Sequence, residues 1–142
     1  MTTMRHILDR KGRAVYAVEP EDPVLEAIRL MAEHHVGALL VMRGEALEGI
    51  VSERDYARKV ILLGRSSNET PVWQIMSSPV TSVGPEASVE VCMRIMTERR
   101  IRHLPVLEGR RVIGVISIGD LVKSFIEDQR ETIEQLESYI HR

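Results

Sequence analysis

The chain has 142 residues, enough for one ordinary domain or for two small units that share a core. Its 19 basic and 21 acidic residues give a net charge of −2, which argues against a nucleic-acid binder and against general attraction to anionic membranes. One cysteine, Cys92, excludes an intrachain disulfide framework. With no apolar stretch long enough to span a bilayer and no signal-peptide pattern at the N-terminus, we expect a cytoplasmic protein.

An internal repeat organises the chain. Shifted by 65 residues, Val15–Tyr56 aligns with Val80–Leu121 without a gap, and 14 positions are identical. Two copies are too few, and each is too long, for a solenoid. The repeat therefore predicts a duplicated subdomain with pseudo-twofold symmetry, and each copy is small enough that we expect the two to pack together.

Both copies predict the same order of elements, β-α-β-β-α, preceded by a short helical lead-in at Met4–Leu8 or Val72–Met76. In the first copy the elements are Ala14–Val18, a helix from Val24, Ala38–Met42, Leu47–Val51 and a helix after Ser52. In the second copy they are Val80–Val83, a helix from Val89, His103–Leu107, Val112–Ile116 and a helix after Ser117. Asp22 and Ser88 are expected to cap the first helix of each copy.

The expected fold class is α/β (α+β), with two repeats and a long C-terminal helix. The predicted segments are a lead-in at 1–13, repeat 1 at 14–66, a linker at 67–79, repeat 2 at 80–128 and a C-terminal helix extension at 129–142. Apolar residues follow a heptad-like stripe along that helix, from Val122 to Ile140, interrupted by Gln129. The stripe either covers its own module or contacts a second copy, and we favour a homodimer.

A Gly-apolar-apolar-Ser-x-x-Asp motif ends the third strand of each copy, at Gly49–Asp55 and Gly114–Asp120. A helix that begins there offers backbone N–H groups and a partial positive charge to a phosphate, and the aspartate can accept hydrogen bonds from a ribose diol. Ser followed three residues later by Asp is also a capping-box-like pattern, so a single occurrence would mean little. Two occurrences in one register favour a binding function.

These motifs, with the strand Ile101–Val106, resemble the tandem CBS-domain pair, or Bateman module, over Ala14–Ile126. The resemblance implies a stand-alone regulatory module, without enzyme activity or a required metal, that binds AMP, ADP, ATP or NAD in clefts between the repeats. It implies that ligand binding changes the conformation read by a regulated protein, whose identity is unknown. An S-adenosylmethionine-type ligand and a structural dimerisation module with non-functional clefts are the alternatives.

The resemblance assigns parts of both repeats to each cleft. In one cleft Asp55 would hold the ribose, beside the ligand-facing residues Ser52, Arg54, Arg102 and His103 and the adenine-pocket walls Thr81, Ser82, Val83, Leu104 and Pro105. In the other, Asp120 would hold the ribose beside Ser117, with walls at Tyr16, Ala17, Gly37 and Ala38. The basic residues predict that the Asp55 cleft prefers a phosphorylated ligand.

An enzyme acting on nucleotides is the rival from another class. The sequence has no Gly-x-x-x-x-Gly-Lys-Ser/Thr loop, no metal-ligand cluster and no evident nucleophile–base pair. His34 and His35 are adjacent on a helix and therefore point about 100° apart, which makes them a poor metal pair. Cys92 aligns with Ala27 on an apolar helix face and is expected to be a core residue.

Overall fold

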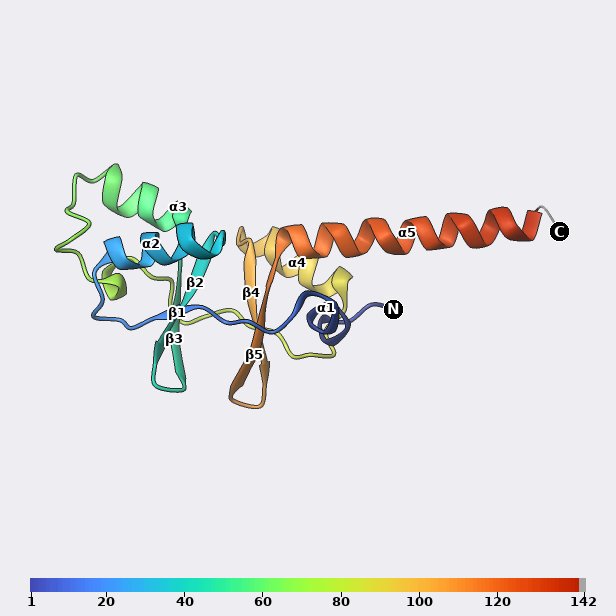
Figure 1. Cartoon of the computed structure of the whole chain (residues 1–142), viewed down its shortest axis with the longest axis horizontal. Coiled ribbons are helices and arrows are strands. Elements are labelled where there is room, and N and C mark those ends of the chain that lie inside the picture. The colour runs from blue at the N-terminus through green and yellow to red at the C-terminus, as the bar shows by residue number, and fades with distance from the viewer. Residues whose placement is uncertain (141–142) are drawn as a thin grey trace. The chain divides into compact units, whose positions relative to one another are not determined.

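The computed structural model describes residues 1–140 and divides the chain into two compact units. Unit 2 consists of Ala14–Thr81 with Arg110–Val112 and holds repeat 1. Unit 1 consists of Met1–Arg13, Ser82–Gly109 and Ile113–Arg142 and holds repeat 2. Each repeat therefore folds around its own core, in a mixed α/β architecture (Figure 1).

Unit 2 contains a three-stranded sheet in the order β1-β2-β3, with helices around it. Strand β1 pairs parallel to β2, and β2 pairs antiparallel to β3. Its elements are β1 (Ala17–Val18), α2 (Val24–His34), β2 (Ala38–Arg43), β3 (Ala46–Ser52), α3 (Glu53–Tyr56), the π-helical turn η1 (Ala57–Ile61) and the 3-10 turn η2 (Val72–Gln74). The expected β-α-β-β-α order is confirmed, although the first strand is shorter than predicted.

Unit 1 follows the same plan with a two-stranded sheet. Its elements are α1 (Met4–Lys11), α4 (Val89–Arg99), β4 (His103–Glu108), β5 (Arg111–Ser117) and α5 (Ile118–Ile140). The predicted first strand is reduced to one parallel bridge, from Val83 to Val106, which matches the Val18–Val41 pair of unit 2 in register. The helix α5 runs 23 residues, and no described helix is long and apolar enough to cross a membrane.

The two repeats share their unusual backbone positions. His35 and Arg100, which align in the repeat, both take left-handed conformations, with φ of 54° and 55°, at the ends of α2 and α4. Gly44 and Gly109 supply the positive φ of the two hairpin turns, at 61° and 65°. Because non-glycine residues adopt such angles at an energetic cost, the shared pattern confirms that the two copies have one fold.

The lead-in segments complete the opposite repeats. Met4, Ile7 and Leu8 of α1 lie in the core of unit 1 with repeat 2, whereas Val72 and Ile75 lie in the core of unit 2 with repeat 1. Each segment precedes one repeat along the chain but packs in the core of the other, which the sequence pattern does not predict. The segment that precedes repeat 1 therefore packs in the core of repeat 2, and the segment that precedes repeat 2 packs in the core of repeat 1.

Backbone contacts show that the two lead-ins play equivalent parts. Thr3 bridges to Ser88, and Pro71 bridges to Pro23, the position that aligns with Ser88. The carbonyl of Thr2 accepts the N–H of Val89, and the carbonyl of Thr70 accepts the N–H of Val24, at 3.2 and 2.9 Å. Each lead-in therefore caps the first helix of the repeat against which it packs.

That arrangement explains why one predicted cap is absent. The Ser88 hydroxyl caps α4 by accepting the N–H of Val91 at 3.2 Å, as expected. Asp22 does not cap α2: Pro23 is the N-cap residue, and the Asp22 carboxylate accepts the N–H of Glu19. The prediction for Asp22 is wrong because linker carbonyls, including that of Thr70, already accept the first N–H groups of α2.

The motif glycines lie where the lead-ins cross the sheets. A Cβ at Gly114 would stand 2.4 Å from Cδ2 of Leu8, and one at Gly49 would stand 2.5 Å from Sδ of Met76. Real Cβ contacts are essentially never this short, so a side chain at either position would force the Leu8 or Met76 side chain to move. The first residue of each motif therefore permits packing of a lead-in on the strand that carries the motif.

Candidate functional site

The start of α3 in repeat 1 is a reciprocal cap. The Ser52 hydroxyl accepts the N–H of Asp55 at 3.2 Å, and Oδ2 of Asp55 accepts the N–H and the hydroxyl of Ser52, both at 3.0 Å. The N–H of Glu53 donates to the carbonyl of Gly37 at 3.0 Å. The Asp55 side chain keeps 16% of its surface exposed.

Repeat 2 reproduces this geometry at the start of α5. The Ser117 hydroxyl accepts the N–H of Asp120 at 3.2 Å, and Oδ2 of Asp120 accepts the N–H of Ser117 at 2.8 Å. The N–H of Ile118 donates to the carbonyl of Arg102 at 2.8 Å, as Glu53 does to Gly37 in repeat 1. Asp120 is also half-buried, with 23% of its side chain exposed.

These caps limit what the helix starts can offer to an anion. A helix begins with four N–H groups that have no partner inside it. In each repeat the cap and one backbone carbonyl, that of Gly37 or Arg102, satisfy all but one of them. Within residues 1–140 the N–H groups of Arg54 and Gly119 have no hydrogen-bond partner. The expectation of a set of unpaired donors is thus corrected to one backbone donor per repeat, and other groups must supply most of a phosphate site.

Each aspartate also meets one lysine. In repeat 1, Nζ of Lys59, one helical turn along the chain, lies 3.1 Å from Oδ1 of Asp55 and donates to the carbonyl of Ile75. In repeat 2, Nζ of Lys11 lies 2.5 Å from Oδ2 of Asp120 and 2.8 Å from the carbonyl oxygen of Val115.

Sequence reasoning missed both lysines. Lys59 could have been found from its i, i+4 spacing to Asp55. Lys11 lies outside the repeat and 109 residues from Asp120, so no spacing pattern points to it. Burial alone would raise the pKa of Asp120, but the hydrogen bonds from Lys11 and Ser117 outweigh that effect and hold the pKa below its usual value.

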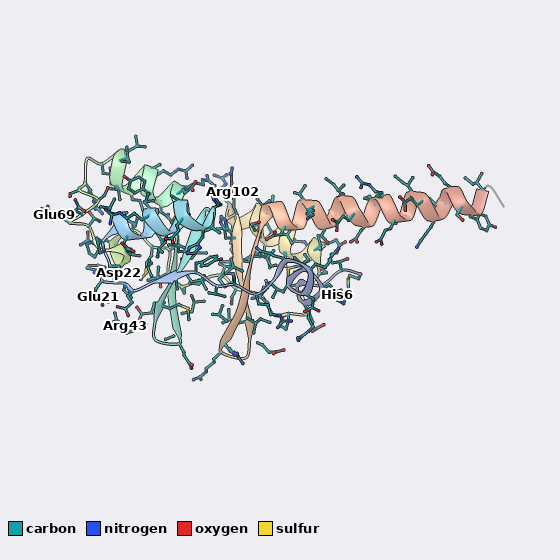
Figure 2. All side chains as sticks on the ribbon, in the orientation of Figure 1. His6, Glu21, Asp22, Arg43, Glu69 and Arg102 are labelled. Carbon is teal, nitrogen blue, oxygen red and sulfur yellow. The ribbon has the colours of Figure 1, made fainter. Side chains whose placement is uncertain are left out.

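His103 belongs to the surroundings of Asp120. It begins β4 in unit 1, and its pKa is lowered first by burial and then by the charges of Lys11 and Arg102, against an opposing effect of Asp120. Arg102 lies just before β4, near the start of α5 (Figure 2). The imidazole is therefore held neutral near pH 7, whereas the nearby lysine and arginine are charged.

The structure groups the predicted residues by repeat. Unit 2 holds Asp55 with Tyr16, Ala17, Gly37, Ala38 and Thr81; unit 1 holds Asp120 with Ser82, Val83, Arg102, His103, Leu104 and Pro105. In unit 2, Ala38 pairs with Ser52 across the sheet, and Tyr16 stacks on His34 with ring centroids 3.8 Å apart. In unit 1, Leu104 is fully buried in the core. The assignment of each set to the aspartate of the opposite repeat stays a prediction.

Cys92 is fully buried in the core of unit 1, and burial raises the pKa of its thiol to about 11, which fits a packing role and not a nucleophile. Among residues 1–140 there is no group of three or more His, Cys, Asp and Glu side chains that could hold a metal ion.

Known proteins share both the sequence and the fold. The CBS-domain family model matches residues 5–61 and 72–127. The CBS domain-containing protein CBSX3, mitochondrial, of Arabidopsis thaliana is 40% identical over 98% of this chain and 72% of its own length. The structure of a putative signal-transduction protein with CBS domains from Burkholderia ambifaria is 55% identical, with a TM-score of 0.87, over 90% of this chain and 96% of that one.

A more distant structure of the same fold was solved with a nucleotide. The CBS domain protein PAE2072 from Pyrobaculum aerophilum, complexed with AMP, has a TM-score of 0.74 and 24% identity over 84% of this chain and 89% of its own. The two family matches cover both repeats and include both Ser-x-x-Asp motifs. The chain therefore belongs to the CBS-domain family and carries a tandem pair of CBS domains.

Proposed function

We propose that the chain is a regulatory module that binds an adenine nucleotide, AMP, ADP, ATP or NAD, in clefts between its repeats and has no enzyme activity. Proteins that consist of a CBS pair are generally regulatory, and one protein with this fold was solved with AMP. Cytoplasmic location and the identity of a regulated protein stay predictions.

The observation that carries the proposal is the shared carboxylate geometry. In both repeats the aspartate caps its helix through Oδ2, and Oδ1 takes no part in the cap. One side chain can therefore hold the helix start in place and still accept a hydrogen bond from a ribose hydroxyl. Partial exposure of Asp55 and Asp120 leaves such an approach open.

The charges near Asp120 favour that site for a phosphorylated ligand. Lys11 and Arg102 are cationic and interact electrostatically with His103, whose neutral ring can donate or accept a hydrogen bond. Each lysine donates to a backbone carbonyl, Lys11 to that of Val115 and Lys59 to that of Ile75, so the difference between the two sites rests on Arg102 and His103. We therefore propose the stronger nucleotide site at Asp120, in place of the earlier expectation that Arg102 and His103 serve Asp55.

Regulation would follow from a shift between arrangements of the repeats. A ligand stabilises one arrangement only by as much as it binds that arrangement more tightly than the other. A protein that recognises the favoured arrangement would then be bound or released as nucleotide levels change.

A thermal-shift screen with AMP, ADP, ATP, NAD and S-adenosylmethionine tests the proposal. A ligand that binds the folded chain raises the melting temperature progressively with its concentration. Asp120→Ala should move the rise due to that site to roughly ten- to a hundredfold higher nucleotide concentrations, and Ser88→Ala, which removes the helix cap of α4 and no proposed ligand contact, is the control. A flat response to every adenosyl compound would favour the rival function, a structural dimerisation module, and turnover of a nucleotide would favour an enzyme.

A further inference from the structure

The helix α5 presents an apolar seam that its own unit leaves uncovered. The seam consists of positions spaced alternately four and three residues apart: Val122, Ile126, Gln129, Ile133, Leu136 and Ile140. Its apolar members are exposed to between 41% and 74%, and a shallow groove follows its middle part. From Gln129 onward every described residue of the helix is exposed.

A different face of α5 contacts unit 1. Leu121 and Ser124 are buried, and the following turn is held by an ion pair from Arg10 to Glu127 at 2.8 Å. The hydroxyl of Thr2 donates to Asp128 at 2.8 Å. With 3.6 residues per turn, the seam lies about 150° around the helix from this contact face. The seam therefore points away from unit 1 even where α5 lies against it.

We propose that the seam binds the seam of a second copy of this chain in an antiparallel helix pair. Alternating steps of four and three residues are the spacing with which two helices interlock side chains. In the antiparallel register, Ile126 faces Leu136 of the second copy, Ile133 faces Gln129, and Ile140 faces Val122. Each copy supplies the same residues to the pair, so the contact closes with twofold symmetry.

Charges beside the seam select this direction. Lys123, Arg130 and Glu137 follow one edge of the seam at intervals of seven residues. Antiparallel pairing places Lys123 of each copy opposite Glu137 of the other, which gives two favourable charge pairs. It also brings the two Arg130 side chains together at the centre, which gives one unfavourable pair. Parallel pairing would leave Lys123 and Glu137 about 21 Å apart along the axis, without charge attraction.

Aromatic side chains occupy the other edge. Phe125 and Tyr139 lie there, exposed to 43% and 75%, and the antiparallel register brings Phe125 against Tyr139 of the second copy. Aromatic pairs contribute beyond the area that they bury. In this one antiparallel register the seam and both of its edges therefore match the seam and edges of the second copy.

Cysteine cross-linking tests the register. Ile126→Cys and Leu136→Cys chains should form a disulfide with each other when mixed under oxidising conditions. Neither should cross-link with itself, because like positions lie about 15 Å apart in the antiparallel pair, beyond the reach of a disulfide. Glu131→Cys, on the opposite face of α5, is the control that should not cross-link. Like-with-like products, or no product in the mixture, would overturn the proposal.

A charge exchange tests the same pairing without introduced cysteines. Lys123→Glu and Glu137→Lys should each weaken self-association in sedimentation equilibrium by about two- to thirtyfold, and the double variant should regain most of the loss. Glu131→Lys makes the same charge change away from the seam and should have no effect. Loss without recovery in the double variant would contradict the pairing. No nucleotide enters these measurements, so their failure is distinct from failure of the ligand proposal.

Discussion

In each repeat a lysine lies beside the motif aspartate, Asp55 or Asp120, but the two lysines come from different parts of the chain. In repeat 1 the lysine is Lys59, within the repeat, and the aligned position of repeat 2 is Ser124. In repeat 2 the lysine is Lys11 of the lead-in. A duplicated fold thus preserves the charge pair while its source changes.

A second ion-pair cluster differs in the same way. Arg43 of repeat 1 pairs with Glu21 and Glu48, at 2.6 and 3.0 Å (Figure 2). The position that aligns with Arg43 is Glu108, and here Arg5 of the lead-in binds both Glu108 and Glu86. Repeat 2 therefore depends on α1 for cations that repeat 1 carries itself, and the predictions below test that dependence.

The largest expected effect is on the apolar side of α1. Leu8→Ala should lower the free energy of unfolding by about 2–5 kcal/mol, because Leu8 is fully buried in the core of unit 1 and its loss leaves a cavity. Met76→Ala, the equivalent change against repeat 1, should cost less because Met76 is only partly buried. Chemical denaturation of both variants gives the comparison, and equal losses would contradict unequal dependence on the lead-ins.

The motif glycines sharpen this comparison. Gly114→Ala should cost about 1–3 kcal/mol by overpacking, and Leu8→Ala in the same chain should recover part of it, because the three atoms nearest to the new methyl group all belong to Leu8. Gly49→Ala should be rescued less by Met76→Ala, since the carbonyl of Ser77 also lies 3.0 Å from the new methyl.

Gly119→Ala is the control for these glycine variants. The nearest atom to a Cβ at Gly119 is the Ser117 hydroxyl at 3.6 Å, and alanine favours a helix, so stability should be equal or higher. Equilibrium denaturation measures all of the variants. If the losses in the free energy of unfolding simply add in the double variant Gly114→Ala with Leu8→Ala, the close approach of Leu8 to Gly114 does not contribute to stability.

A smaller effect is expected at the lysine of repeat 2. Lys11→Met should lower the free energy of unfolding by less than about 1 kcal/mol, because Lys11 is more than one-third exposed and its ion pair is screened by water. The same change should raise the pKa of Asp120, since its largest stabilising partner is lost. Carboxyl NMR titration measures that pKa, and Lys59→Met should leave it unchanged. An unaltered pKa in Lys11→Met would contradict the contact.

The smallest expected effect is the pH dependence due to His103. Its pKa in the folded chain is below 6.5, so the unfolded chain binds more protons between the folded pKa and 6.5. The free energy of unfolding should therefore fall as the pH drops through and below 6.5. His103→Gln should reduce this slope in denaturation series from pH 7.5 to about 5, a range set by the reference value of histidine. An unchanged slope would contradict burial of the imidazole.

Repetition explains what could be predicted from sequence. The aligned motifs predicted the element order, the Ser52, Ser88 and Ser117 caps and the hairpin turns, because these depend on residues near one another in the chain. The exchange of lead-ins could not be predicted, because Met4–Leu8 and Val72–Met76 share almost no residues. Lys11 is the last residue of α1, beyond Met4–Leu8 and outside the repeat, so its contact with Asp120 depends on tertiary packing alone.

The most direct test of the ligand proposal combines a change in the protein with a change in the nucleotide. Isothermal titration calorimetry compares AMP with its 2′- and 3′-deoxy forms, on the native chain and on Asp120→Ala. If the carboxylate holds the ribose, deoxygenation and Asp120→Ala should each weaken binding by roughly ten- to a hundredfold, and together by no more than either alone. Losses that multiply, or native affinity in Asp120→Ala, would contradict the account.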